Sequence, residues 1–435
     1  MHLKKDPLLV LTTRPFQPSG SFRAHVLTLM TGTTIAQALP ILVAPILTRV
    51  YSPEEFGVYS LYMSLVSIVS LIATARYELA LILPEKEEEA LNIFGLSIAI
   101  LSIGSLGALI ITLLFNERIA NMLNRPDIRT WLYLAPATIF ITGFNQILTY
   151  WLIRKRKFKR LAMNKITQSG SICVTQLIGG FANSIPGGLI LGQIVGQSTG
   201  VGIIGWQSLK EEKKNFLLIN RKGMKEQAKR YYKFPKYSML ADFINIVANQ
   251  TPYFMLNNFF GAATVGFFAL SYRILGTPIA LIASSVLDVF KERASRDYVR
   301  DGNCFAIYKK TLKGLLILSF LPFSVLFFAL PKVIPLVFGI QWAVAGEYAQ
   351  ILTVLFFVRF IVSPLSYILY IAEKQKYDLI WQICLLTATV GSLMIGVGYN
   401  SAKISIRAFS LAYSSLYLVY LFMSYNFAKG KKTLF

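Results

Sequence analysis

The sequence contains few charged residues, few cysteines and very few histidines. Only 15% of its 435 residues are charged and 54% are hydrophobic, with a mean hydropathy of +0.54. Soluble globular domains carry about 25% charged residues, so this composition excludes a soluble protein. Cys173, Cys304 and Cys384 are widely spaced and odd in number, and only His2 and His25 accompany them. We therefore expect neither disulfides nor a metal site.

Acidic residues are also scarce, with 21 against 44 basic residues, which gives a net charge of +23. Such an excess is found in proteins that bind nucleic acid and in proteins that contact anionic membranes. Here the basic residues occupy short segments between apolar runs, such as 154–160 and 210–236, and no domain is left that would present a groove to nucleic acid. We therefore expect an integral membrane protein without a nucleic-acid partner.

Long apolar runs fill most of the chain. A helix of about 20 residues spans the roughly 30 Å hydrocarbon core of a bilayer. Twelve runs have about this length: 24–47, 56–83, 91–115, 130–153, 161–181, 189–209, 238–260, 264–289, 305–330, 348–372, 377–399 and 404–427. The sequence therefore predicts an all-α membrane protein with twelve transmembrane helices.

The basic residues fall mainly in every second connection, in the polar leader 1–23 and in the tail 428–435. Positive charge concentrates on the cytoplasmic side of membrane proteins, so both termini are predicted to be cytoplasmic. No apolar segment of signal-peptide length precedes the first run, and we expect the leader to be a cytoplasmic tail. The longest basic connection, 210–237, divides the chain into two predicted six-helix lobes, 24–209 and 238–427.

The two predicted lobes share short stretches of similar sequence. Residues 51–62 align with 260–271 at an offset of 209 residues, which places Gly57 over Gly266. A looser match aligns 150–158 with 370–377. Six helices in each half give the halves the same topology, related by an axis along the membrane normal. Two parallel lobes of this kind are typical of transporters that bind their substrate between the lobes.

Arg76 and Glu78 lie within the apolar run 56–83. A charge near the centre of a bilayer costs about 2.5–3.5 kcal/mol on insertion scales, so such residues tend to face a partner, a cavity or a transport path. Arg76 is also close enough to the predicted helix end to extend to the interface and pair with Glu78 or with the acidic segment 85–89. Both interpretations are open from the sequence.

Polar residues and prolines recur in the first run of each half. They are Gln37, Pro40 and Pro45 in the first half and Asp242, Asn245, Asn249 and Pro252 in the second. The spacing of three to four residues puts the second set on one helix face, where it would line a cleft. Packing between membrane helices, with asparagine and glutamine as hydrogen-bonding glue, is the alternative. The prolines are predicted gating positions, because proline bends a helix.

Arg273 and Arg359 lie deeper within their runs, 264–289 and 348–372. With Arg76 they come from both halves, and the acidic residues at comparable depth are too few to pair with all three. A surplus of guanidinium groups suits an anionic ligand, and their planar fork fits phosphate oxygens. A structural Arg–Asp pair, for example with Asp242, is the competing interpretation.

Two segments resemble a known family. The stretch RYELALILPEKEEEALNIFG (76–95), preceded by LTRVYSPEEFGVYSLY (47–62), is similar to the second-helix region of Wzx-type polysaccharide flippases. These O-antigen and capsule exporters belong to the multidrug/oligosaccharidyl-lipid/polysaccharide exporter superfamily. By this resemblance Arg76 and Glu78 take the family's charged positions in helix two. The leader 1–23 is longer than the family pattern predicts.

The resemblance implies a V-shaped, two-lobed bundle in the bacterial cytoplasmic membrane that is not an enzyme and has no cofactor. Such a protein moves an undecaprenyl-pyrophosphate-linked oligosaccharide from the inner to the outer leaflet and is driven by a proton or sodium gradient. Membrane lipids and the glycan polymerase machinery are the expected partners. Tyrosines in the same helices, among them Tyr59 and Tyr272, would stack on sugar rings or pack between helices.

Two other functions stay open. A multidrug–cation antiporter on the same scaffold would be expected to hold acidic residues deep in its amino-terminal lobe, whereas Glu78 is predicted to be shallow and beside an arginine. A membrane glycan polymerase or ligase would be expected to carry a large outer loop with catalytic groups. The longest outer segments, 116–129 and 331–347, contain no histidine and no pair of carboxylates at catalytic spacing.

Overall fold

The computed structural model describes residues 20–182, 187–213 and 215–430, with side chains from residue 28 onward. His2, most of the predicted leader 1–23 and the end of the predicted tail 428–435 lie outside the described residues. Every regular element within the described ranges is helical. The all-α fold class predicted from the sequence is therefore confirmed.

The helices follow one another in two halves joined by a short helical segment. The first half consists of α1 (Gly20–Val50), α2 (Pro53–Thr74), η2 (Tyr77–Ile82), α3 (Glu87–Met122), η3 (Pro126–Ile128), α4 (Arg129–Leu132), α5 (Ala135–Arg154), α6 (Phe158–Phe181) and α7 (Gly187–Glu212). The joining segment contains η4 (Asn215–Leu218), α8 (Arg221–Arg230) and η5 (Phe234–Ser238). The second half consists of α9 (Met239–Phe260), α10 (Ala262–Asp301), α11 (Phe305–Phe338), η6 (Ile340–Trp342), α12 (Ala343–Leu365), α13 (Ile368–Ile371), α14 (Gln375–Gly398) and α15 (Ala402–Ala428).

The number of apolar spans is smaller than predicted. Nine of the described helices are long and apolar enough to cross a membrane, and the bent pair Pro126–Leu132 and Ala135–Arg154 is a tenth. The other two predicted spans correspond to α6 and α9, which have 24 and 22 residues but carry more polar side chains. α6 packs between α1 and α7, and α9 packs between α2 and α14. Their polar residues can therefore face protein rather than lipid.

The predicted span 56–83 is not one helix, and this prediction was wrong. α2 ends at Thr74, and Ala75 and Arg76 then adopt left-handed backbone conformations with φ of 47° and 61° before η2 begins. Arg154, at the end of α5, donates from Nη1 to the carbonyls of Leu81 (3.1 Å) and Pro84 (2.6 Å). These bonds satisfy backbone groups that a continuous helix would have paired itself. Arg76 therefore lies in the irregular segment between α2 and η2, after α2 has ended.

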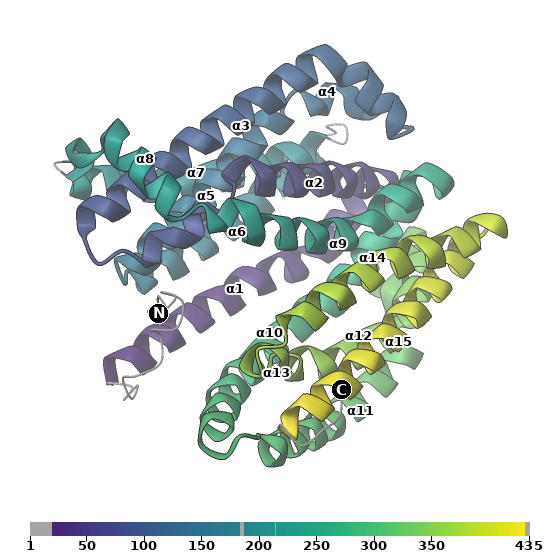
Figure 1. The fold of residues 1–435 in the computed structure, drawn as a ribbon. Coiled ribbons are helices and arrows are strands. Elements are labelled where there is room, and N and C mark those ends of the chain that lie inside the picture. Colours follow the sequence, from purple (N-terminus) through teal and green to yellow (C-terminus); the bar gives the residue numbers. More distant parts are fainter. Residues whose placement is uncertain (1–19, 183–186, 214, 431–435) are drawn as a thin grey trace.

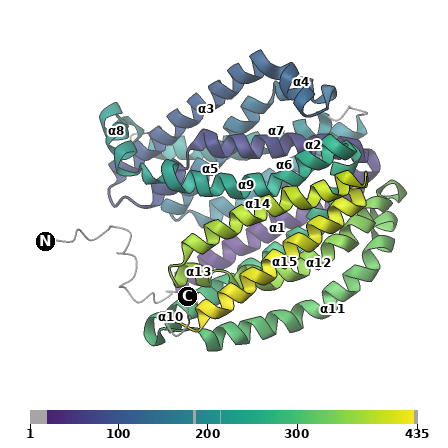
Figure 2. The same cartoon turned by 45° about the vertical axis from the view of Figure 1, so that its right-hand side comes forward.

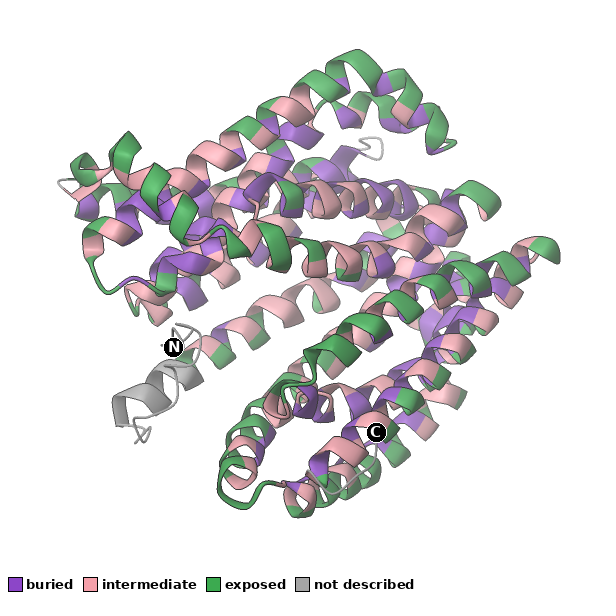
Figure 3. Ribbon diagram, viewed as in Figure 1, coloured by how far each residue is buried: buried purple, intermediate pink, exposed green. Residues whose placement is uncertain are grey.

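The two halves converge at one end of the molecule and diverge at the other (Figure 1). The wide end holds α8, α13 and both ends of the described chain, and Figure 2 shows the same divergence after rotation. We call the opposite end, where α2 and α10 begin, the narrow end. Exposed residues run along the outer face of α3 in Figure 3, and large apolar side chains such as Ile103 and Leu114 are about 70% exposed there. An apolar exposed band of this kind is a surface for lipid.

Each half has its own hydrophobic core, and residues near the narrow end pack into the core of the opposite half. Leu47 and Phe56 of the first half pack into the core of the second, and Ala262 of the second half packs into the core of the first. The ring of Phe56 meets Trp342 edge-on at 5.0 Å, and Trp342 Nε1 donates to the carbonyl of Thr48 at 2.8 Å. The narrow end is therefore closed by direct packing between the halves.

Two glycines allow this close packing. A Cβ atom on Gly57 would lie 1.9 Å from the carbonyl oxygen of Ala262, and one on Gly266 would lie 1.9 Å from that of Pro53. No larger residue fits at either position while the narrow end is closed. These are the two glycines that the internal repeat aligns, so equivalent positions of the two halves meet at their crossing.

Candidate functional site

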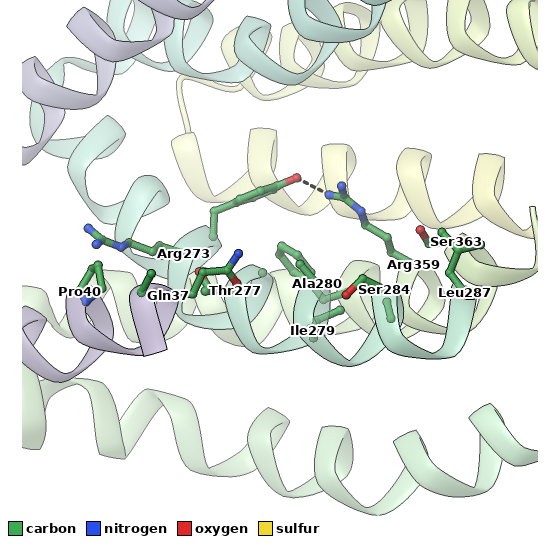
Figure 4. A pocket seen from close by; sticks show the side chains of 15 residues that line it. Gln37, Pro40, Arg273, Thr277, Ile279, Ala280, Ser284, Leu287, Arg359 and Ser363 are labelled. Atoms are coloured by element: carbon green, nitrogen blue, oxygen red, sulfur yellow. Dashed lines mark hydrogen bonds between the residues drawn. The ribbon is translucent and has the colours of Figure 1, made fainter. Parts of the chain in front are cut away.

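A cavity of about 670 Å³ lies between α1 of the first half and α10 and α12 of the second. We call it the central cavity. Gln37 and Pro40 of α1, Arg273 of α10 and Arg359 of α12 line it (Figure 4). None of the described residues that line it is acidic. The structure thus brings together four of the residues predicted from the sequence, and they come from both halves.

Arg273 has no hydrogen-bond or ion-pair partner among the described residues. It lies eleven residues into α10, about 16 Å along the helix from the narrow end, at a depth where the hydrocarbon core would surround the bundle. A guanidinium at this depth without a protein partner is costly unless water or a ligand solvates it. The side chain projects from α10 toward α1, beside Pro40 and Gln37 (Figure 4).

Arg359 has a neutral partner. Its Nη1 donates to the hydroxyl oxygen of Tyr272 at 2.5 Å, and its guanidinium carbon lies 6.0 Å from the centre of the Phe356 ring. No carboxylate lies within 4.0 Å of it in the described part of the chain. Tyr272 packs against Phe268 and Phe356, in agreement with the packing interpretation, and its hydroxyl also accepts the hydrogen bond from Arg359. The single neutral hydrogen bond leaves most of the five guanidinium donors free for a ligand.

Gln37 is the polar residue that α1 contributes. Its Oε1 atom is buried and has no hydrogen-bond partner within the described ranges. A buried amide oxygen without a donor costs about 1–3 kcal/mol, which a water or a ligand hydroxyl would recover. Gln37 therefore lies beside Arg273 with unused acceptor capacity (Figure 4).

Arg76, Glu78 and Asp242 form a separate cluster outside the lining of the central cavity. Arg76 Nε donates to Asp242 Oδ2 at 2.7 Å, its Nη2 lies 2.6 Å from the same oxygen, and Nη1 lies 3.4 Å from Glu78 Oε1. Glu78 is fully buried, whereas the Asp242 side chain is 39% exposed. This geometry agrees with the structural ion pair that was open from the sequence, formed between the two halves. A substrate-binding role for these three residues stays a prediction.

We expect Arg76→Ala to lower the amount of protein in the membrane, because it leaves Glu78 buried without a counter-charge. Breaking a buried pair costs roughly 3–5 kcal/mol, and we expect less here because Asp242 is partly solvated. The double variant Arg76→Ala with Glu78→Gln should recover part of the loss. Membrane abundance and thermal unfolding of the purified protein measure both effects.

The matched control for this pair is Arg296→Ala, since Arg296 pairs with Glu292 on an exposed helix surface. This control should stay within about 0.5 kcal/mol of the parent. An Arg76→Ala protein that accumulates normally but delivers no glycan would contradict a structural pair and favour substrate contact.

The remaining predicted residues lie on α9 and α1. Asn249 Nδ2 donates to the backbone carbonyl of Asn245 at 2.8 Å and to its side-chain oxygen at 3.2 Å, so the Asn249 amide is bonded to the preceding turn of its own helix. Pro45 and Pro252 lie within α1 and α9 without ending either helix. Prolines also occur within α10, α11 and α12, so they are not restricted to the first helix of each half. Gating by Pro40, Pro45 and Pro252 stays a prediction.

One cation near the cavity was missed from the sequence. Lys165 of α6 donates from Nζ to Thr33 Oγ1 at 3.1 Å, and Thr33 precedes Gln37 by one turn of α1. No carboxylate lies within 4.0 Å of Lys165 in the ranges that the structure describes. The signal in the sequence is a lysine inside the predicted apolar run 161–181.

The family model described as "Polysaccharide biosynthesis protein" matches residues 46–347. The chain belongs to this family. A curated relative is the succinoglycan biosynthesis transport protein ExoT of Rhizobium meliloti (strain 1021), which is 23% identical over 365 residues, or 82% of this chain and 71% of the relative. The resemblance to polysaccharide flippases that the sequence indicated is thereby confirmed.

Solved structures share the fold of this family member. The lipid II flippase MurJ in an inward closed conformation has a TM-score of 0.73 at 15% identity, over 92% of this chain and 87% of that chain. An inward-facing multidrug resistance MATE family transporter of the MOP superfamily has a TM-score of 0.68 at 15% identity, over 89% of this chain and 93% of that chain. The V-shaped exporter fold is therefore confirmed. The names of the matched proteins describe transporters and a flippase. Up to ten of the described helices or bent helix pairs of this family member are long and apolar enough to cross a membrane, as in a multi-pass membrane protein.

Proposed function

We propose that the protein moves an undecaprenyl-pyrophosphate-linked oligosaccharide from the inner to the outer leaflet of the bacterial cytoplasmic membrane. The observation that carries this proposal is the pair Arg273 and Arg359, which open onto one cavity between the halves without an acidic partner among the described residues. A pyrophosphate headgroup cannot cross hydrocarbon unaided, because desolvating its charges costs many kcal/mol. The central cavity would replace water around it with guanidinium donors.

The proposed cycle is alternating access between the two halves. The wide end, which holds the basic segments and both ends of the described chain, is the cytoplasmic side by the distribution of positive charge. In this state the headgroup loads from the inner leaflet while the prenyl tail stays in lipid. Separation of the two halves at the narrow end would then release the headgroup outward. The helices would bend at Pro40, Pro45 and Pro252, and a proton or sodium gradient would drive the cycle.

The proposed arrangement assigns the two lobes to 24–209 and 238–427, with 210–237 as the cytoplasmic linker. The Arg76–Asp242 pair would then join the first lobe to the start of the second. Released repeat units would pass to the glycan polymerase machinery. An exporter of cationic drugs on the same fold is the second candidate, and the absence of acidic residues among the described lining of the central cavity disfavours it.

Reconstituted vesicles test this function directly. With undecaprenyl-pyrophosphate oligosaccharide in both leaflets, an impermeant glycosidase should cleave only the outer half in protein-free vesicles, and nearly all of it when the protein is present. The control is the same oligosaccharide on a neutral lipid linker, whose cleavage should stop at half. Cleavage that stops at half for the pyrophosphate lipid, with proton and sodium gradients applied in either direction, would overturn the proposal.

A further inference from the structure

A second cavity of about 260 Å³ lies between α2 of the first half and α9 and α10 of the second. Ser60, Ser67, Gln250, Tyr253 and Arg273 are among its lining residues. Arg273 lines both cavities, so the second cavity adjoins the central one at this side chain. None of the residues in the described lining is acidic.

The second cavity lies closer to the narrow end than the central cavity does. Its α10 residues are Ala269, Leu270 and Arg273, whereas the lining of the central cavity follows α10 from Tyr272 to Leu287. Phe56 belongs to its lining and also packs against Trp342 in the contact that closes the narrow end. The second cavity thus lies between the central cavity and the contact that closes the narrow end.

The lining offers both hydrogen-bond donors and acceptors. The Ser60, Ser64 and Ser67 hydroxyls donate to carbonyls of α2 at 2.7–2.8 Å, which leaves their oxygen lone pairs available as acceptors. Neither the Gln250 amide nor the Tyr253 hydroxyl has a hydrogen-bond partner in the part of the chain that the structure describes. Each sugar hydroxyl both donates and accepts, so a sugar ring matches this mixture.

The shape and charge of the lining favour a single uncharged ring. Tyr59 and Phe56 add aromatic surface for the C–H face of a sugar, and the Tyr59 hydroxyl is fixed by a 3.0 Å bond to Gln193. Among the described lining residues only Arg273 carries charge, and it is shared with the central cavity. A further anionic group here would have no counter-charge of its own. The volume is below the roughly 300–1,000 Å³ of pockets for drug-sized ligands, which fits one ring.

We propose that the second cavity is a sugar subsite, which binds one uncharged sugar ring of the lipid-linked glycan while Arg273 and Arg359 hold its pyrophosphate. This inference rests on the proposed function. Recognition of the headgroup is thereby divided between two sites. The cationic site binds any pyrophosphate lipid, and the neutral site binds the sugar. Because the sugar would lie directly beneath the Phe56–Trp342 contact, it would be the first part of the headgroup exposed when the narrow end parts.

The test compares two probes on the purified protein: undecaprenyl pyrophosphate without sugar, and the same lipid carrying one neutral hexose. The quantity measured is the ratio of their dissociation constants. The parent should bind the hexose lipid about tenfold more tightly, the effect of one or two good hydrogen bonds. Gln250→Leu, which removes the amide at similar volume, and Ser60→Leu, which fills the cavity, should each bring the ratio close to one.

Two controls separate the inference from the proposed function. Ser324→Leu replaces a half-buried serine of α11 that makes the same in-helix hydrogen bond and lines neither the central nor the second cavity, and its ratio should match the parent. Arg359→Ala should weaken binding of both probes and keep the ratio. A parent that binds both probes equally, or variants that keep the parental ratio, would overturn the sugar subsite alone. A parent that binds neither probe would overturn the proposed function as well.

Discussion

Replacing Arg273 or Arg359 by alanine should abolish delivery of glycan to the cell surface while the protein still accumulates in the membrane. Each change removes an intramembrane cation that has no acidic partner among the described residues, so no buried carboxylate is left behind. Arg359→Ala strands only the Tyr272 hydroxyl. Loss of a charge-assisted contact costs about 1.5–3 kcal/mol, which is a fall of roughly 10- to 150-fold in headgroup affinity.

Lysine variants at these two positions distinguish the contribution of the positive charge from that of the guanidinium geometry. An ammonium keeps the positive charge but lacks the planar fork that holds two phosphate oxygens at once. Arg273→Lys and Arg359→Lys should therefore restore transport only in part. Surface glycan by staining or lectin binding, set against protein abundance by immunoblot, gives transport per molecule.

The control for the arginines is Arg407→Ala, since Arg407 is exposed on α15 and lines neither the central nor the second cavity. It should leave both glycan and abundance unchanged. An abundant Arg359→Ala protein with normal surface glycan would contradict the role of that residue. The same outcome at Arg273 as well would remove the basis for a cationic headgroup site.

Valine at Gly57 or Gly266 should stop transport by preventing closure of the narrow end. At either position the first added carbon would lie 1.9 Å from a backbone carbonyl oxygen of the other half, and backbone cannot move aside as a flexible side chain can. Overpacking costs about 1–3 kcal/mol, which shifts the balance between closed and open states roughly 5- to 150-fold. Each half keeps its own core, so the variants should still fold.

The effect of the glycine variants is measured as the accessibility of the second cavity to a reagent that enters from the narrow end. In a protein with its three cysteines replaced by serine, Ser60→Cys should react slowly with an impermeant thiol reagent added outside. Adding Gly266→Val should speed this reaction at least about fivefold, in line with the shift in population. Gly107→Val and Gly391→Val are matched controls, since a Cβ at either meets nothing within 4 Å. Unchanged labelling and transport in both test variants would refute the steric closure.

Much of the architecture could be predicted from the sequence because hydropathy is summed along each helix. The composition identified a membrane protein, and the internal repeat aligned Gly57 with Gly266 before their contact was visible. Arg273 and Arg359 stood out because a charge inside an apolar run is costly wherever the helix packs. The Wzx-type resemblance also agreed with the family match over residues 46–347.

The sequence was least informative where the backbone leaves the regular helix. The run 56–83 reads as one apolar span, yet α2 ends at Thr74. Arg154, about seventy residues away, donates to carbonyls of the segment that follows, a contact that the hydropathy of the run does not reveal. The same limit explains why fewer described helices than predicted are apolar enough to count as membrane spans. Polar helices such as α6 and α9 are stable when neighbouring helices cover them, and hydropathy does not record which neighbours they have.

What the sequence by itself determined was the class of protein, the family and the presence of arginines within apolar runs. Only the tertiary structure decided their roles. Arg76 lies 166 residues from Asp242 in the chain and pairs with it, while Arg273 has no described partner and lines two cavities. The physical reason is that burial energies depend on residue type and can be read along the chain. Ion pairs, cavities and glycine contacts depend on where distant helices cross, which packing of the whole bundle sets.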